Sequence, residues 1–532
     1  MKILKASQMQ QIDRLTTERF GMPGLTLMEN AGSGVVAFLV ERFSPLNGQK
    51  IAIFCGKGNN GGDGLVVARL LRERSLTPRV LLFAEPAALK GDAAVNYQRL
   101  LQSSSAEIVK DYAVWLDVKG SLSGTTLIVD ALIGTGLSKP LGGFLKEVVQ
   151  DLNNGFPSAS RVAVDLPSGL SADTGDLIGD CVRADASITF TAPKYAHVFP
   201  PACEKVGEWR VHQIGTPPEA LEADPELFLS LTCRAEVLWL AAKRAMDTHK
   251  GTYGHVLVLA GSVGKTGAAA MAAKSALRSG AGLVTVATSK SALPAVAAFG
   301  MEFMTEPLPE TEAGAVSLRA LDSGQIDRLM EGKSVLAVGP GLGGVAETAE
   351  LIREVVNRSM VPVVLDADGL NAFAGRMDEL ETANRIRVLT PHPGEMARLS
   401  GLNTTDIQKR RVEVARDFAI RHHVYLVLKG ARTLVASPDG RVAVNPTGNP
   451  GMATGGAGDC LTGIIAGLLA QFPEKPVTEV LAAAVYLHGL AGDVAARKMG
   501  EASMIAGDLI DAIPEAWLSL MKGSTDRSDE GC

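Results

Sequence analysis

A glycine-rich stretch near the C-terminus surrounds a single acid. Residues 449–463 read NPGMATGGAGDCLTG, and the apolar run IIAGLLAQF follows. The acid is Asp459, and the glycines around it are Gly451, Gly455, Gly456 and Gly458. Glycines that precede a helix leave backbone N–H groups unpaired, so that a phosphate can approach them. A carboxylate at that turn can take a proton from a hydroxyl that attacks phosphorus. Helix capping would explain Asp459 but not the glycines, so the stretch predicts an anion hole with Asp459 as a general base.

Three further loops in the first half each follow an apolar run. They read CGKGNNGGDGLVVARLL, LIVDALIGTGLSKPLGG and VAVDLPSGLSADTG. The first loop could present N–H groups to an anion, but Asn59 and Asn60 interrupt the dinucleotide-binding GxGxxG spacing. Because ligands of parallel sheets bind outside the carboxyl ends of the strands, we expect Asn60, Asp130 and Asp165 to converge on one site. Either aspartate alone could instead cap the next helix.

Two motifs in the second half resemble known sites without matching them. AGSVGKTGAAA is not a Walker A loop, because Leu259 stands where the first glycine is required. In LTPHPGEMARL, His392 and Glu395 have a spacing that metal ligands can have. With no second motif nearby, helix capping or contact with a substrate is the preferred interpretation.

These residues must be positioned by strands that alternate with helices. The first half has apolar, β-branched runs at 51–55, 79–83, 126–130, 161–165 and 186–190. The second half has them at 255–260, 283–287, 334–338, 363–366, 387–389 and 424–428. Such alternation predicts an α/β fold with doubly wound parallel sheets, and the opening segment through LMENAGSGVVAFLV should be a helix that packs on the first sheet.

Composition and charge limit the class of protein. The 532 residues carry a net charge of −6, 46% are hydrophobic and 21% are charged, which is typical of a soluble globular protein with more than one domain. Six scattered cysteines without a CxxC motif argue against disulfides or zinc. The N-terminus lacks a signal-peptide pattern, and the apolar runs are shorter than a membrane span. We therefore expect a cytoplasmic protein, a homo-oligomer, with neither nucleic acid nor membrane as a partner.

Prolines and acids in GTPPEALEADPE interrupt the alternation. We expect a first domain at 1–215, a linker at 216–234, a second domain at 235–520 and a flexible tail at 521–532.

The first half resembles the N-terminal domain of the YjeF family, the NAD(P)H-hydrate epimerases, which has a Rossmann-like doubly wound sheet. GNNGGDG, VDALIGTG and VDLPSGL carry the resemblance, together with LMENAG and TFTAPK. It implies catalysis by Asp165 and a potassium ion near Asn60, Asp130 and Ser168. It also implies a set of substrate-binding residues: Asn59, Asn60, Gly61, Gly62, Asp63, Gly134, Thr135, Gly136, Leu137, Ser138, Lys139, Pro140 and Asp165. Lys194 could be another polar group at this site, but an exposed lysine is the preferred interpretation.

The second half resembles the YjeF C-terminal domain, the ribokinase-like ADP- or ATP-dependent NAD(P)H-hydrate dehydratases. HKGTYGHVLVLAGS, SGAGLVTVAT, VGPGLG, DADGLN, TPHPGEMARL, LKGA and the stretch around Asp459 carry this resemblance. It implies substrate contacts at Ala268, Gly341, Gly343, His392 and Asp459. It implies nucleotide contacts at Lys429, Gly430, Ala431, Arg432, Thr433 and Gly458, with Mg²⁺ bound alongside the nucleotide. Lys265 and Ala457 depart from the family pattern, which often has Tyr and Ser there.

Together the two resemblances imply a bifunctional repair enzyme. The first domain would interconvert the R and S hydrates of NADH or NADPH. The second would use ADP to dehydrate the S hydrate, giving NAD(P)H, AMP and phosphate. One alternative is a ribokinase-like kinase of a vitamin precursor with an N-terminal nucleotide-binding domain, which leaves the first half without a task. A second alternative is a nucleotide-sensing regulator, against which the intact Asp459 argues.

Overall fold

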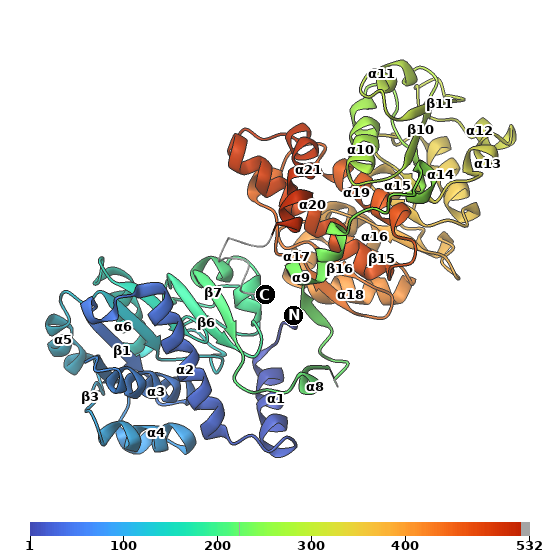
Figure 1. The fold of residues 1–532 in the computed structure, drawn as a ribbon. Helices are drawn as coiled ribbons and strands as arrows, with labels where there is room; N and C mark the ends of the chain where they lie inside the picture. The colour runs from blue at the N-terminus through green and yellow to red at the C-terminus, as the bar shows by residue number, and fades with distance from the viewer. Residues whose placement is uncertain (223, 523–532) are drawn as a thin grey trace. The chain divides into compact units, whose positions relative to one another are not determined.

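The computed structural model describes residues 1–222 and 224–522 (Figure 1). The chain forms two compact units, and the division falls between Leu227 and Phe228. The fold class predicted from the alternating pattern is confirmed, because each unit is built on its own mostly parallel sheet with helices around it. Residues from 523 onwards, which include most of the predicted tail, lie outside the described residues.

The first unit contains a seven-stranded sheet in the order β3-β2-β1-β4-β5-β6-β7. All neighbouring strands are parallel. The strands are β1 (Ile51–Cys55), β2 (Arg79–Leu82), β3 (Glu107–Ile108), β4 (Leu127–Ala131), β5 (Ser160–Val164), β6 (Ala186–Phe190) and β7 (Glu208–His212). The order reverses between β1 and β4, so a topological switch point lies there, where ligands of such sheets bind.

Helices cover both faces of this sheet. They are α2 (Gly24–Phe43), α3 (Asn59–Glu73), α4 (Gly91–Leu101), α5 (Tyr112–Ser121) and α6 (Gly143–Asn154). The unit also contains α1 (Ala6–Glu18) and the single turn α7 (Tyr195–Val198). Side chains of a strand alternate between faces. Accordingly Ile53 packs with α2, α3 and α4, whereas Phe54 packs with α5 and α6. Because both faces are buried, the strands are continuous apolar runs, which is why the sequence pattern located them.

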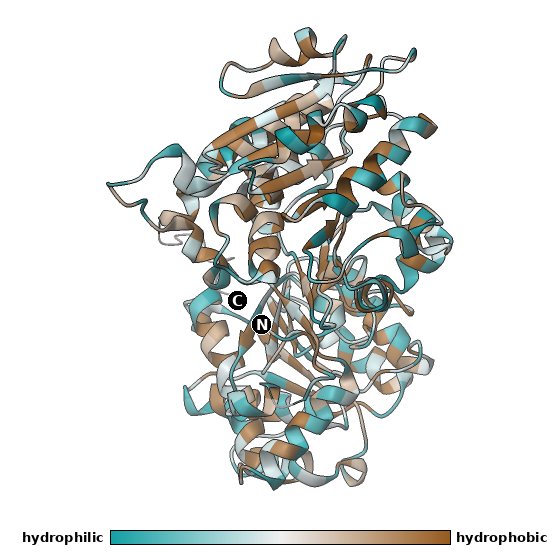
Figure 2. Ribbon diagram, turned by 90° about the vertical axis from the view of Figure 1, so that its right-hand side faces the viewer, coloured by the Kyte–Doolittle hydropathy of each residue, from teal (hydrophilic) through white to brown (hydrophobic). Residues whose placement is uncertain are grey.

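The second unit contains a ten-stranded sheet in the order β11-β10-β9-β12-β13-β14-β15-β16-β17-β8. Its strands are β8 (Leu229–Leu231), β9 (His255–Leu259), β10 (Leu283–Ser289), β11 (Met304–Leu308), β12 (Val335–Val338), β13 (Val363–Leu365), β14 (Arg387–Leu389), β15 (Tyr425–Leu428), β16 (Leu434–Ala436) and β17 (Val442–Val444). Pairing is parallel from β11 to β15, antiparallel between β15, β16 and β17, and parallel again between β17 and β8. Figure 2 shows that the strands are predominantly hydrophobic.

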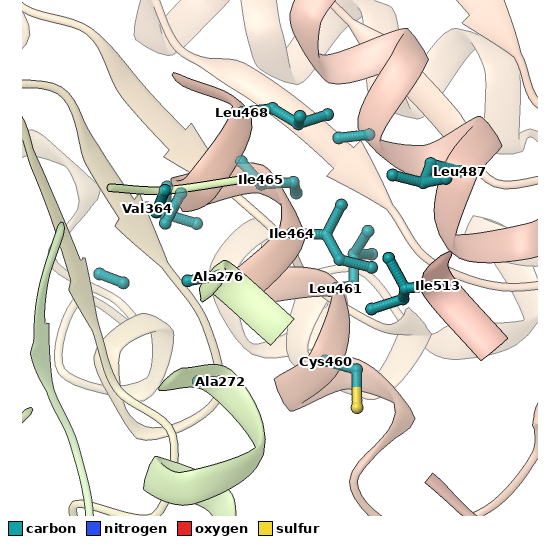
Figure 3. Packing of buried hydrophobic residues seen from close by; sticks show 14 of the residues in the cluster. Ala272, Ala276, Val364, Cys460, Leu461, Ile464, Ile465, Leu468, Leu487 and Ile513 are labelled. Carbon is teal, nitrogen blue, oxygen red and sulfur yellow. The ribbon is translucent and has the colours of Figure 1, made fainter. Parts of the chain in front are cut away.

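The core of the second unit is organised around α19 (Ala457–Gln471), which begins at the glycine-rich stretch. This helix is apolar on all sides, as expected for a helix that is surrounded by others. It packs against α10 (Thr266–Arg278), α20 (Val477–Met499) and α21 (Ala506–Met521). Figure 3 shows its Cys460, Leu461, Ile464, Ile465 and Leu468 among side chains of these helices and of β13.

One helix among the described residues, α20, is long and apolar enough to cross a membrane by length and composition. Its most apolar window has a mean hydropathy of 1.2, and 67% of that window is buried inside the structure. In this structure α20 is a core helix of the second unit.

Candidate active sites

The first site is a cavity of about 830 Å³ at the carboxyl ends of β1, β4 and β5. Nine residues singled out in the sequence line it: Asn59, Asn60, Asp63, Gly134, Thr135, Gly136, Leu137, Asp165 and Lys194. Gly61, Gly62, Ser138, Lys139 and Pro140 are not among its lining residues, and substrate binding by them stays a prediction. At Gly61 a Cβ atom would lie 1.9 Å from the carbonyl oxygen of Gly56, so this glycine is required by packing of the loop.

Asp165 and Lys194 form a buried ion pair in this cavity. Lys194 Nζ donates to Asp165 Oδ1 at 2.7 Å, to Thr189 Oγ1 at 2.8 Å and to the carbonyl oxygen of Phe190 at 3.1 Å. Lys194 is only 1% exposed, so the preferred interpretation of an exposed lysine is wrong. Burial by itself would raise the pKa of Asp165, but the Lys194 ammonium and the hydrogen bonds lower it below its ordinary value. Asp165 is therefore held as a carboxylate.

His197 fixes the backbone beneath this pair. Its Nδ1 accepts from the backbone N–H of Lys194 at 3.1 Å, so Nε2 carries the hydrogen and donates to the carbonyl oxygen of Asp165 at 3.0 Å. Burial, reinforced by Lys194, lowers the pKa of His197 to about 4, which keeps the ring neutral. Asp165 has a φ of +64°, a conformation unfavourable for a non-glycine residue, and the His197 contact helps to hold it.

A group of oxygen atoms lies beside the cavity. Asp130 is fully buried, and its carboxylate accepts from the backbone N–H of Ser168 at 2.8 Å and from Ser168 Oγ at 2.6 Å. Burial raises the pKa of Asp130 to about 6, against the effect of these hydrogen bonds. The side-chain nitrogen of Asn60 donates to the carbonyl oxygen of Val164 at 2.9 Å, and its side-chain oxygen accepts from the backbone N–H of Gly134 at 3.3 Å. Carboxylate, hydroxyl, amide and carbonyl oxygens without nitrogen or sulfur suit a hard cation. Within the described residues no group of three or more His, Cys, Asp or Glu side chains could hold a metal ion.

The second site lies where α19 begins. Gly456 precedes this helix with a φ of +93°, and Asp459 lies in its first turn. Lys429 Nζ donates to Asp366 Oδ1 at 2.6 Å and lies 3.7 Å from Glu395 Oε2. Thr462 Oγ1, one turn after Asp459, donates to Asp366 Oδ2 at 2.8 Å. The loop after β15 and the start of α19 are thus joined through Asp366 at the end of β13.

The charges of this cluster set its protonation. Burial, together with the nearby Asp366, raises the pKa of Asp459 to about 7, and Lys429 only partly offsets this. For Lys429, burial would lower the pKa, but Asp366 and Glu395 raise it, so the amine stays charged. A carboxyl with its pKa in this range can accept a proton near neutral pH.

Ala268, Gly341 and Gly343, which were predicted to contact the substrate, lie in α10 and in the loop after β12. Gly341 lies against Ala268, since a Cβ atom on Gly341 would be 3.2 Å from the Cβ of Ala268. The backbone N–H of Gly343 donates to Asp368 Oδ2 at 2.7 Å, and Lys265 Nζ lies 3.6 Å from the same oxygen. These contacts bring together the loops after β9, β12 and β13.

His392 confirms the capping interpretation. It precedes α16 (Pro393–Ser400), and its Nδ1 accepts from the backbone N–H of Gly394 at 3.0 Å. Glu395 Oε2 accepts from the backbone N–H of His392 at 2.8 Å, which completes a capping box. Whether His392 also contacts a substrate stays a prediction.

Sequence reasoning missed several polar residues at both sites. In the second site these are Asp366, Asp368 and Thr462; the two aspartates lie in DADGLN, where their position after a strand was a usable signal. In the first site they are Gln10, Asp13, Arg14 and Thr17, all on α1. The spacing of the α1 residues is that of one helix face, but nothing in the sequence shows what that face meets.

The fold and the two sites define a two-domain enzyme. A Rossmann-like unit with a carboxylate–lysine pair at its switch point precedes a ribokinase-like unit in which Asp459 lies in the first turn of α19, after a glycine-rich stretch. The family model described as the YjeF-related protein N-terminus matches residues 24–196, and the model described as NAD(P)H-hydrate dehydratase matches residues 256–515.

Two relatives resemble the chain over nearly its whole length, and a solved structure resembles it over 55% of its length. The bifunctional NAD(P)H-hydrate repair enzyme Nnr of Moorella thermoacetica is 44% identical over 521 residues, with 97% of this chain and 96% of the relative covered. The enzyme of the same name from Thermofilum pendens is 38% identical, with 98% and 97% covered. A crystal structure of the ADP/ATP-dependent NAD(P)H-hydrate dehydratase from Bacillus subtilis, co-crystallised with ATP/Mg²⁺, is 31% identical. It covers 55% of this chain and 98% of its own, with a TM-score of 0.48.

The chain therefore belongs to the family of bifunctional NAD(P)H-hydrate repair enzymes. Its first domain is the epimerase and its second the ADP-dependent dehydratase, as the sequence predicted. A vitamin-precursor kinase or a nucleotide sensor would not account for the matched first domain.

Proposed function

We propose that Asp459 is the general base of the dehydratase and that Asp165 is an acid/base group of the epimerase. The observation that carries the proposal is the position of Asp459: a carboxyl with a pKa near 7 lies in the first turn of a helix that opens with glycines. A base works best when its pKa is near the operating pH, and unpaired N–H groups stabilise a transferring phosphoryl group.

In the dehydratase, Asp459 takes the proton of the hydroxyl at C6 of the S hydrate. The hydroxyl oxygen forms a bond to the terminal phosphorus of ADP, and the bond to AMP breaks with its electron pair on AMP. The backbone N–H groups at the start of α19 hold the transferring group, and Lys429 balances its charge. The phosphate ester then leaves with loss of a C5 proton, which restores the ring double bond. A poor leaving group has become a good one.

The nucleotide would lie against residues 429–433 and Gly458. Lys429 Nζ is within reach of Gly458, since a Cβ atom there would lie 3.2 Å from it, so one anion could contact both. The carboxylates of Asp366 and Glu395 lie beside Lys429 and supply oxygen atoms that suit Mg²⁺ bound with the nucleotide. When bound, Mg²⁺ would neutralise charge on the phosphates.

In the epimerase, Asn60, Asp130 and Ser168 would hold a potassium ion. All three residues are buried, and Ser168 Oγ donates to Asp130 Oδ1 at 2.6 Å. Side chains that offer only oxygen ligands suit a hard cation. When bound, the ion would supply a positive charge beneath the loop that follows β4. The substrates would be the hydrates of NADH and NADPH. We further propose a cytoplasmic homo-oligomer, which size-exclusion chromatography with light scattering tests.

Incubation with chemically hydrated NADH, ADP and Mg²⁺ tests the proposed function. Chromatography that resolves both epimers should show both disappearing as NADH and AMP form. If hydrated NADH persists while a vitamin-type alcohol is phosphorylated, the kinase alternative is correct instead.

A further inference from the structure

One face of α1 forms a wall of the epimerase cavity. Met9, Gln10, Asp13, Arg14 and Thr17 all line it. They are spaced at i, i+1, i+4, i+5 and i+8, the spacing of residues that share one side of an α-helix. The family model of this domain matches residues 24–196, so the whole helix precedes the matched region.

The segment that carries Lys194 also anchors α1. The backbone N–H of Leu4 donates to the carbonyl oxygen of Pro193 at 2.9 Å, and Leu4 forms a parallel bridge with Lys194. The backbone N–H of Ala6, the first residue of α1, donates to Asp173 Oδ1 at 2.7 Å. Leu4, Met9 and Ile12 pack in one apolar cluster with Ala192. The helix is thereby fixed relative to the Asp165–Lys194 pair.

Asp13 stands out on this face. Its Oδ1 is buried and has no hydrogen-bond partner among the described residues, which is unfavourable for a carboxylate and requires an explanation. The charged groups that act on it are Lys194, Asp165 and Asp63, and Arg14 lies next to it on the helix. Because Asp13 lines the cavity, its carboxyl group is placed to exchange a proton with what binds there.

We propose that Asp13 is a second catalytic residue of the epimerase, which donates a proton to the departing C6 hydroxyl while Asp165 accepts one from the incoming water. The inference rests on the proposed role of Asp165. The two carboxyls are suited to opposite tasks. Burial raises the pKa of Asp13 to about 6, against the effect of Lys194, whereas the pKa of Asp165 is lowered. Such divergent environments are the usual mark of an acid and a base in one site.

The step is balanced. The C6–O bond breaks with its electron pair on oxygen, which takes the proton of Asp13 and leaves as water. The lone pair of N1 forms the C6=N1 double bond of a cation. Water adds to the other face of C6, the double bond returns its electrons to N1, and Asp165 takes the released proton. In the reverse direction the two carboxyls exchange roles, as an epimerase requires.

Asp13→Asn in the full-length enzyme tests the proposal, because asparagine has nearly the shape of a protonated aspartate. We expect the kcat of R-to-S conversion to fall about 10²- to 10⁴-fold, with KM little changed, since a proton donor acts on the transition state. Dehydration of pure S hydrate with ADP should stay at the wild-type rate, because that reaction takes place in the second unit. An unchanged KM for the R hydrate shows that the mutated first unit is folded. Glu18→Gln, the same change at an exposed position of α1, is the matched control and should leave both activities unchanged.

A pH profile gives a second readout. In the wild type, kcat/KM for epimerisation should fall as pH rises through about 6, because Asp13 then loses the proton that it donates. Asp13→Asn should lack this fall with rising pH, and Asp13→Glu should restore part of the rate. The proposal is overturned if Asp13→Asn epimerises at the wild-type rate. It is also overturned if the fall in kcat/KM with rising pH is absent in Asp63→Asn but still present in Asp13→Asn. If the wild type itself does not accelerate epimerisation, the proposed function has failed instead.

Discussion

Asp165 is buried and Asp459 is partly buried, and their surroundings give the two carboxyls different properties. Lys194 donates directly to Asp165, whereas the neighbouring carboxylate of Asp366 raises the pKa of Asp459. The sequence predicted both residues, because each follows or precedes a glycine-rich loop. It could not predict their protonation, since Lys194 and Asp366 reach them only through the folded sheets.

Asp459→Asn should separate the two activities. The amide keeps the size of the side chain but cannot accept the proton, so dehydration should slow by about 10²- to 10⁴-fold. In the wild type, kcat/KM for dehydration should rise with pH through about 7 and then level off, because only the deprotonated carboxyl is a base. Chromatography of both epimers measures this, and Asp165→Asn is the converse variant. Loss of epimerisation in Asp459→Asn would contradict the two-site assignment.

The Lys265→Ala variant tests whether this lysine acts as the lysine of a P-loop does. Its side chain is 52% exposed and lies 3.6 Å from Asp368 Oδ2, so it forms a solvent-accessible ion pair. Because solvent-accessible ion pairs contribute little free energy, Lys265→Ala should lower the dehydration rate by less than about tenfold. The dehydration rate with ADP is measured for the variant and the wild type, and calorimetric titration measures nucleotide binding. Abolished nucleotide binding would mean that this lysine acts on phosphate after all.

At the level of elements, most strands of both sheets were predictable, but β3, β7, β8, β11, β16 and β17 were not. Each predicted strand occurs, because a strand covered on both faces is a continuous apolar run. β7 is half-buried along its length and reads EWRVH, which lacks that signal. β8, β16 and β17 have three residues each and were not predicted, whereas β13 and β14, which are as short, were. α1 was predicted as part of a helical opening segment, but its contacts at Pro193 and Lys194 are distant in sequence.

The close packing of α19 against α10 gives a stability prediction. A Cβ atom on Gly463 would lie 2.1 Å from the carbonyl oxygen of Ala272, a backbone atom that cannot move away easily. Gly463→Ala should therefore lower the free energy of unfolding of the second domain by roughly 1–3 kcal/mol. Gly507→Ala, on the exposed side of α21 with no atom closer than 3.8 Å, is the control and should be neutral or stabilising. Calorimetric Tm values compare them, and an unchanged Tm for Gly463→Ala would show that the helices can separate.

At the scale of the whole molecule, the predicted linker contains ordered elements. α8 (Pro218–Glu222) lies in the first unit, where Ala220 and Leu227 pack in the apolar cluster of α1. Gln8 Nε2 donates to the carbonyl oxygen of Glu226 at 3.1 Å. Prolines and acids led to the prediction of a linker, but they say nothing of the contacts that the few apolar residues make.

A cut between Leu227 and Phe228 should accordingly give two soluble, active fragments. Fragment 1–227 should keep epimerase activity, whereas fragment 1–216 should lose much of it, because α1 loses apolar neighbours. Separate expression followed by assays of each activity tests this. Equal epimerisation by both fragments would show that residues 217–227 do not support α1.

The three residues of β8 have a consequence for self-association. They pair in parallel with β17, at the end of the ten-stranded sheet, and so cover backbone groups that another chain could bind. A dehydratase domain that starts at residue 235, where the sequence pattern places it, would leave the N–H and C=O groups of β17 on that side without partners. We therefore expect a stand-alone second domain made without residues 229–231 to self-associate more readily than one that contains them.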